Sequence, residues 1–316
     1  METQLEADEL NLSKLAKEYS DEDRARELFE SMRWPNGKPI CPFCKFDEAY
    51  KITSKEGTKK QNKARAGLYC CAACRKTFTA TVGTAFEDSR LPISKWLLAI
   101  FIICSSKKAV SAAQLSRMLG VTYKTAWFMA HRIRFSMADD SKTKLSGVVE
   151  IDETFIGGVG DPKTKLSRLT PVMALIEQGG KMKARVVPNV SYKNLGRVLR
   201  EEVQKDAVIC SDENTAYHHV NKEFKAHHTV NHSKYEYILK TTDGISAGTN
   251  HCESFFSLLK RGVHGAWHSV SREHLPKYVN EFAFRWNTRK LSDGQRMANF
   301  MPLIDGKRLM YNRPKN

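Results

Sequence analysis

The segment Val148-Val-Glu-Ile-Asp-Glu-Thr-Phe-Ile156 decides the fold class of this chain of 316 residues. Apolar and polar residues alternate along it and many are β-branched, which predicts a β-strand. Gly157-Gly158 follows and marks the end of the strand. Asp152 lies inside the strand, so the sequence predicts a carboxylate at a fixed position on a sheet.

The segments that follow predict a mixed α/β domain. Apolar runs over 171–177, 183–188 and 207–210 indicate three more strands, and Gly179-Gly180 is typical of a hairpin turn. Residues 191–205 carry apolar side chains on one helical face, which predicts a helix before the last strand. The order β-β-β-α-β favours a ribonuclease-H-like fold for residues 147–290.

Two further acids lie where this fold would need them for a metal site. Asp212 follows the fourth predicted strand, and Glu253 begins a predicted helix over 253–261. Lys260 is seven residues after Glu253, nearly two helical turns, so both lie on one face. Cleavage or transfer of a phosphodiester needs an activated oxygen nucleophile and a stabilised leaving oxygen, and two Mg²⁺ ions about 4 Å apart provide both. Carboxylates suit such ions, so we predict that Asp152, Asp212 and Glu253 bind two Mg²⁺ or Mn²⁺ ions.

Each acid also has a structural interpretation. Glu150 lies two residues before Asp152, on the same face of the strand, as a solvated acidic strand would have it. Asp212 would serve equally to cap the next helix, and Glu253 is a favourable charge at a helix start. The order of the three acids on these elements favours the metal site.

Two C-x-x-C pairs lie nearer the N-terminus, Cys41-Pro-Phe-Cys44 and Cys71-Ala-Ala-Cys74. Each pair can turn two thiolates toward one point, and two pairs complete the tetrahedral site that Zn²⁺ prefers. Cys70 adjoins Cys71 and leaves the register open by one residue, although the spacing favours Cys71. Since all four ligand positions are filled, we predict one structural Zn²⁺ in a ribbon over 33–85.

Residues 86–138 predict a helix-turn-helix after the ribbon. An apolar helix over 94–104 precedes two further helices, over 111–119 and 122–137, and Gly120 stands between these where a turn with positive φ is needed. Ser111 and Gln114 have the spacing of a capping box, and Thr122 is a cap for the last helix. This arrangement is typical of a helix-turn-helix, although an ordinary helical hairpin with a solvated basic face has the same pattern.

The second helix of a helix-turn-helix enters the major groove with its N-terminal side chains. We therefore expect DNA contacts from the start of this helix and a contact nearer the phosphate backbone farther along it: Tyr123, Lys124, Thr125 and Arg132.

The charge balance indicates a polyanionic partner. The chain has 51 Lys and Arg against 35 Asp and Glu, a net charge of +16, and residues 1–32 are acidic at −6, which leaves +22 on the remainder. A surplus of this size favours nucleic acid. The longest apolar run has nine residues, against about 20 for a membrane span, and no secretory signal is recognisable. We expect a cytoplasmic, nucleoid-associated protein whose eight cysteines serve metal binding or burial.

Three of these segments together resemble a known family: Val149-Glu-Ile-Asp-Glu-Thr-Phe-Ile-Gly-Gly158, Ser211-Asp-Glu-Asn-Thr-Ala-Tyr217 and Gly248-Thr-Asn-His-Cys-Glu-Ser-Phe-Phe-Ser-Leu-Leu-Lys-Arg-Gly262. They are similar to the Asp-Asp-Glu transposases of prokaryotic insertion sequences that carry an N-terminal zinc ribbon, the insertion-sequence family numbered fifteen-ninety-five. The segments Cys71-Ala-Ala-Cys-Arg-Lys-Thr-Phe78 and Glu281-Phe-Ala-Phe-Arg-Trp-Asn-Thr-Arg289 share this resemblance, which covers roughly residues 20–290.

The resemblance implies that Asp152, Asp212 and Glu253 form the metal-binding triad, and it favours Asp152 over Glu150. It places Lys260 near transposon-end DNA. We expect further contacts to DNA from its neighbour Arg261 and from Arg285 and Arg289, which lie four residues apart on a predicted helix, although a solvated helix face is an equal alternative for the last two.

The sequence thus predicts a multidomain α+β protein: an acidic helical segment (1–32), a zinc ribbon (33–85), a helix-turn-helix region (86–138), a ribonuclease-H-like α/β catalytic domain (147–290) and a C-terminal tail (291–316). We expect a transposase that binds terminal inverted repeats and cuts and joins double-stranded DNA as a homodimer or larger assembly. The alternatives are a DNA-binding regulator, a nuclease without joining activity, and a zinc-ribbon scaffold for RNA.

Overall fold

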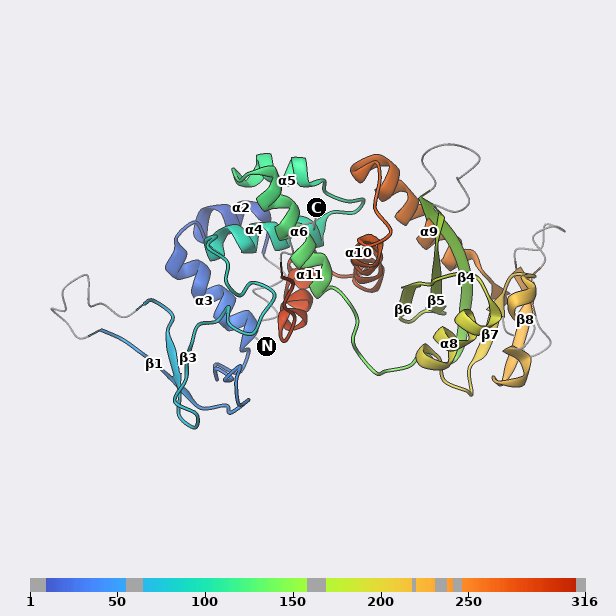
Figure 1. Cartoon of the computed structure of the whole chain (residues 1–316), viewed down its shortest axis with the longest axis horizontal. Coiled ribbons are helices and arrows are strands. Elements are labelled where there is room, and N and C mark those ends of the chain that lie inside the picture. Colours follow the sequence, from blue (N-terminus) through green and yellow to red (C-terminus); the bar gives the residue numbers. More distant parts are fainter. Residues whose placement is uncertain are drawn as a thin grey trace, which may run out of the picture. The chain divides into compact units, whose positions relative to one another are not determined.

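The computed structural model describes residues 10–54, 65–157, 169–217, 220–230, 238–240 and 246–310 (Figure 1). They form two compact units. The first unit runs up to Met137 and includes the described residues from Leu291 onward, and the second unit spans Ala138–Lys290. Gly158 and the first nine residues of the predicted acidic segment lie outside the described residues.

The first unit is built around one apolar helix, α4 (Ile93–Ser105), which buries Trp96, Ile100 and Ile103 among others. It packs against helices from both ends of the chain. The other helices of this unit are α2 (Leu12–Glu18), α3 (Glu22–Arg33), α5 (Ala112–Leu119), α6 (Tyr123–Ser136) and α11 (Asp293–Phe300).

The predicted helix starts and turns in this unit are confirmed. The side chain of Ser111 accepts a hydrogen bond from the backbone N–H of Gln114, and Thr122 accepts one from Thr125. Gly120 ends α5 with φ at 59°, the left-handed conformation that glycine adopts without steric cost. Helices α5 and α6 are therefore two short helices joined by a tight turn, as the sequence predicts.

The ribbon region contains a small antiparallel sheet in the order β1 (Ala49–Lys51), β2 (Tyr69–Cys71) and β3 (Thr77–Phe78). Trp34 packs edge-on against Tyr69 and Phe78, whose rings stack on each other. This aromatic cluster joins the sheet to the end of α3.

Residues 291–316 are predicted as a tail, yet the described part folds into the first unit. Helix α11 and the turn that follows it bury Met297, Phe300, Met301 and Ile304 completely. Ala85 donates its backbone N–H to the carbonyl oxygen of Ile304 at 3.1 Å. These apolar side chains complete the core around α4.

The second unit contains a mixed five-stranded sheet in the order β6-β5-β4-β7-β8. Strands β4 (Val148–Gly157), β5 (Leu169–Glu177) and β6 (Met182–Val186) are antiparallel, whereas β7 (Val208–Ser211) and β8 (Ala226–Thr229) run parallel to β4. Helix α8 (Tyr192–Glu202) connects β6 to β7. The predicted order β-β-β-α-β is confirmed, and a separate hairpin of β9 (Ile238–Lys240) and β10 (Ser246–Gly248) is added.

Helices cover both faces of this sheet. On one face, Val149 and Ile151 of β4 pack with Leu195 and Leu199 of α8. On the other face, Ile156 of β4 packs among residues of α9 (Asn250–Gly262) and α10 (Leu275–Asn287). Because side chains alternate along a strand, Glu150 and Asp152 belong to the α9 face, and Glu153 belongs to the α8 face.

Among the described residues, the helices are too short or too polar to cross a bilayer.

Candidate functional site

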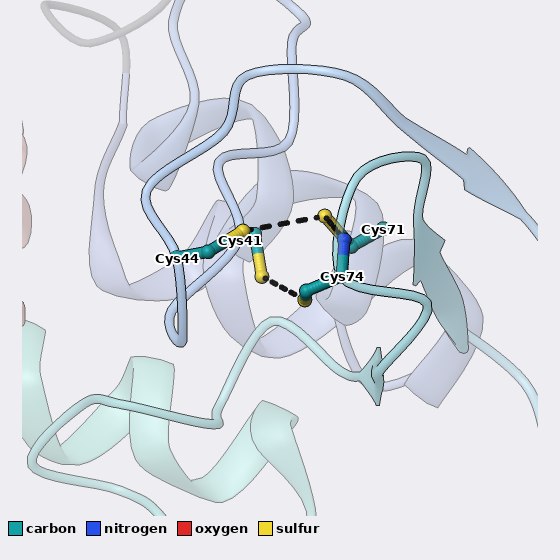
Figure 2. Close-up of side chains that lie close together, drawn as sticks. All are labelled: Cys41, Cys44, Cys71 and Cys74. Carbon is teal, nitrogen blue, oxygen red and sulfur yellow. Dashed lines mark hydrogen bonds between the residues drawn. The ribbon is translucent and has the colours of Figure 1, made fainter.

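The four predicted cysteine ligands converge in the ribbon (Figure 2). Their sulfur atoms all lie within 4.8 Å of one another, with Cys41 Sγ 3.7 Å from Cys74 Sγ and Cys44 Sγ 3.6 Å from Cys71 Sγ. The hydrogen bond from the backbone N–H of Cys74 lowers the pKa of Cys71 to about 7, which favours the thiolate that binds metal. Four thiolate donors at this separation fit a structural Zn²⁺.

Both cysteine pairs lie on the same kind of backbone turn. Cys41 donates its N–H to the carbonyl oxygen of Phe46, and Cys71 donates to Lys76, five residues on in each case. Cys70 is different, because its thiol points to the carbonyl oxygens of Arg75 and Cys71. The register predicted from the spacing, with Cys71 in the cluster and Cys70 outside it, matches the structure.

The three predicted acids come from neighbouring elements of the second unit. Strands β4 and β7 pair Glu150 with Cys210, so Asp212, two residues beyond Cys210, follows beside Asp152. Glu253 lies in the first turn of α9, which packs against β4. Asp152 and Glu253 line one open cleft of about 550 Å³, together with Lys260, Arg261 and His264.

The three acids act on one another electrostatically. Burial, with the negative charges of Asp212, Glu153 and Glu253, raises the pKa of Asp152 to about 7. A hydrogen bond from the backbone N–H of Glu153 opposes this rise. Asp212 does not line the cleft, and among the described residues only the cysteines form a close group of three or more metal-ligating side chains.

Glu150, which the sequence offers as an alternative to Asp152, is buried and hydrogen-bonded within the protein. Its side chain is 3% exposed, and it accepts hydrogen bonds from the backbone N–H of His251 at 3.0 Å and from Gln178 at 3.2 Å. The ring Nδ1 of His251 lies 2.8 Å from Oε1 of Glu150. Glu150 does not line the cleft that Asp152 enters.

Sequence reasoning missed the contacts of Glu153. Its two carboxylate oxygens accept hydrogen bonds from the side-chain amide of Asn214 and from the hydroxyl of Tyr217. Burial and the charge of Asp212 raise the pKa of Glu153, while these hydrogen bonds lower it. The partners are more than 60 residues away in the chain, so no local pattern points to them.

The predicted DNA contacts of α6 divide into two groups. Tyr123 is 59% exposed, Lys124 is exposed, and Thr125 is half-buried at the start of the helix. Arg132 is buried, and it donates a hydrogen bond to the carbonyl oxygen of Glu87 at 3.0 Å. This burial contradicts the predicted contact of Arg132 with DNA, because the guanidinium already lies within the unit.

The predicted contacts of the second unit divide in the same way. Lys260 and Arg261 are exposed and line the cleft of Asp152. Arg285 is buried and forms an ion pair with Glu281 inside α10, which contradicts its predicted contact with DNA. Arg289 is exposed and lies over the ring of Trp286, to whose carbonyl oxygen it donates a hydrogen bond.

We expect the zinc content of cysteine variants to follow the register of the cluster. The Cys71→Ser protein should hold much less than one zinc per chain after dialysis against a weak chelator, because one of four thiolates is lost. The Cys70→Ser protein is the matched control and should keep one zinc, measured by elemental analysis. Loss of zinc in Cys70→Ser alone would place the ligands one residue away.

The raised pKa of Asp152 predicts how stability depends on pH. Since the folded-state pKa lies above the ordinary value near 4, the folded protein favours the protonated acid, and stability falls as pH rises from about 4 to about 7. Asp152→Asn should therefore raise the urea midpoint of the zinc-loaded, magnesium-free protein at pH 8 and change it little at pH 4. Glu201→Gln, an exposed acid on α8, is the control. Equal effects of Asp152→Asn at both pH values would contradict the raised pKa.

Comparisons with known proteins agree with this arrangement. The sequence model of the ISXO2-like transposase domain matches residues 144–287, and that of the transposase zinc-ribbon domain matches residues 20–77. The chain is also similar to a protein of Halobacterium salinarum described as an uncharacterized protein in transposable element ISH50. The two are 26% identical over 289 residues, which cover 85% of this chain and 92% of the relative.

Both sequence models describe one family, and together they match 202 of the 316 residues, in the same order as the two units carry them. The chain therefore belongs to the insertion-sequence transposase family numbered fifteen-ninety-five, with a transposase zinc ribbon ahead of the transposase domain.

Proposed function

We propose that this chain is the DNA transposase of an insertion sequence, which binds terminal inverted repeats and cuts and joins DNA strands. The observation that carries the proposal is the cleft in which Asp152 and Glu253 face Lys260 and Arg261, with Asp212 near enough to raise the pKa of Asp152. Carboxylates beside cations on one open surface suit a reaction on a phosphodiester.

The donor set fits two divalent ions. Burial, together with the nearby charges of Asp212, Glu153 and Glu253, raises the pKa of Asp152, and divalent cations would relieve the repulsion among these carboxylates. Asp152, Asp212 and Glu253 would hold these ions. Bound there, Mg²⁺ or Mn²⁺ supplies activation of the attacking oxygen and stabilisation of the leaving oxygen.

The residues of the chain would position the DNA for this reaction. Lys260 and Arg261 lie about two turns beyond Glu253 on α9 and would bind phosphates on the cleft side of the helix. Asp152 must lose its proton before it can bind an ion, so we expect the apparent affinity of the metal-free protein for Mg²⁺ to increase as pH rises toward about 7. Water would be the nucleophile in cleavage, and a DNA 3′-hydroxyl would be the nucleophile in joining.

The folds of both units support this assignment. In the second unit, three antiparallel strands followed by two parallel ones, with a helix crossing between them, are consistent with a ribonuclease-H-like scaffold. In the first unit, α5 and α6 with the turn at Gly120 are consistent with a helix-turn-helix that presents Tyr123 and Lys124 to the major groove. Joining two element ends to a target requires at least two copies of the chain on DNA.

The chemistry can be tested with labelled DNA that carries the inverted repeat flanking this element. We expect Mg²⁺- or Mn²⁺-dependent cleavage at the repeat boundary and a strand-transfer product with target DNA. Asp152→Asn, Asp212→Asn and Glu253→Gln should each lower the cleavage rate by at least about 100-fold, because several kcal/mol of charge stabilisation is lost. Glu201→Gln is the matched control and should cleave normally.

Each other outcome of this experiment has a distinct meaning. Binding of the repeat without cleavage would contradict the proposal in favour of a DNA-binding regulator. Cleavage without a joined product would indicate a nuclease that lacks joining activity.

DNA recognition by α6 predicts a change in salt dependence. Lys124→Ala should weaken binding to the inverted repeat and lower the slope of log Kd against log salt by about 1, because one phosphate contact is lost. Lys205→Ala, an exposed lysine of the second unit, is the control and should leave both quantities unchanged. An unchanged slope for Lys124→Ala would mean that α6 does not track the DNA backbone.

A further inference from the structure

Two glutamates flank Asp152 on β4, and the proposed function gives neither of them a task. Glu150 lies two residues before Asp152 and Glu153 lies directly after it. They belong to opposite faces of the sheet, and both have their carboxylate oxygens engaged in hydrogen bonds. Apart from the bond that Gln178 donates to Glu150, these bonds reach the chain segments that carry the other two acids.

Glu150 holds the start of α9. Its Oε2 accepts the backbone N–H of His251, and its Oε1 lies 2.8 Å from the ring Nδ1 of the same residue. A carboxylate can only accept, so Nδ1 carries the proton of this bond. His251 is two residues before Glu253 in the first turn of the helix. The carboxylate of Glu150 therefore fixes both the position of this turn and its rotation against β4.

Glu153 holds the loop after β7. One of its oxygens accepts from the side-chain amide of Asn214, and the other accepts from the buried hydroxyl of Tyr217. Asn214 in turn donates its backbone N–H to Oδ1 of Asp212 at 3.2 Å. Its side-chain oxygen also accepts the N–H of Ala216 at 3.0 Å, which closes the loop. A displacement of Asn214 would move the carboxylate of Asp212 directly.

We propose that Glu150 and Glu153 are paired positioning residues: Glu150 sets Glu253 through His251, and Glu153 sets Asp212 through Asn214 and Tyr217. The inference rests on the proposed metal site of Asp152, Asp212 and Glu253. One strand then fixes all three ligands, since it carries Asp152 itself and an anchor for each of the others.

The alternative is that these glutamates bind metal themselves. Glu150 is nearly fully buried and lies outside the cleft, so an ion in the cleft does not reach it. Glu153 does line the cleft, but both of its oxygens already accept hydrogen bonds. The two roles can be separated experimentally. Loss of a positioning residue should not weaken metal binding further once the ligand that it positions has been removed, whereas loss of a direct ligand should.

The test measures Mn²⁺ binding to the zinc-loaded full chain by the electron paramagnetic resonance signal of free Mn²⁺, without DNA or turnover. Glu150→Ala and Glu153→Ala remove the anchors. His251→Ala removes one hydrogen bond of Glu150, and Tyr217→Phe removes one of Glu153. These variants replace the glutamate variants if a buried glutamate variant fails to fold. Each variant is made alone, with Asp212→Asn and with Glu253→Gln. Tyr192→Phe, which removes an exposed hydroxyl on α8, is the matched control.

We expect each anchor variant to weaken Mn²⁺ binding roughly tenfold, the usual scale for residues that orient metal ligands. Loss of the Glu153 anchor should add nothing in the Asp212→Asn background and should keep its full effect in the Glu253→Gln background. Loss of the Glu150 anchor should show the reverse pattern. Tyr192→Phe should bind Mn²⁺ as the unaltered protein does.

Equal effects in both backgrounds would overturn the inference, because general loosening or direct metal binding by the glutamates has that signature. No effect of the anchor variants would overturn it as well. Asp152→Asn separates this from failure of the proposed site. If Asp152→Asn leaves Mn²⁺ binding intact, the proposed metal site itself is wrong. If Asp152→Asn abolishes Mn²⁺ binding but the anchor variants have equal effects in both backgrounds, only the positioning role is refuted.

Discussion

The burial of carboxylates beside one another around β4 is the constraint on which the second unit depends. Burial first, and the like charges of Asp212, Glu153 and Glu253 after it, disfavour the ionised form of Asp152 and raise its pKa. The sheet tolerates it because β4 is paired on both sides and has an apolar core on each face. A less firmly held strand would separate the acids, and the proposed site for divalent cations would be lost with the separation.

The first unit meets a different constraint in a different way. Its helices share a core around α4, but the ribbon has only three short strands and one aromatic cluster. Four sulfur atoms within 4.8 Å of one another would repel as thiolates unless a cation lies among them. Each unit therefore gathers side chains that can bind metal: the cysteine cluster fits a structural Zn²⁺, and the acids around β4 carry the proposed site for divalent cations.

The sequence predicted the features that depend on local physics. Helix caps at Ser111 and Thr122, the left-handed turn at Gly120 and the ribbon register at Cys71 follow from neighbouring residues, and the structure agrees with each. The placement of Arg132 and Arg285 was wrong, because which side of a helix is buried depends on partners distant in the chain. The roles of Glu150 and Glu153 were not predictable for the same reason, since their partners lie 101 and more than 60 residues away. The metal-binding role of the three acids stays a prediction, supported by their shared surroundings.

The return of the chain to its first unit after residue 290 has a consequence for biosynthesis. Met297, Phe300, Met301 and Ile304 leave the ribosome after every residue of the second unit, yet they fill the core beneath α4. The unit that carries α5 and α6 therefore cannot finish folding until the second unit has been synthesised. A polypeptide released before α11 has been synthesised would expose the apolar surface that α11 covers and would become a substrate for proteolysis.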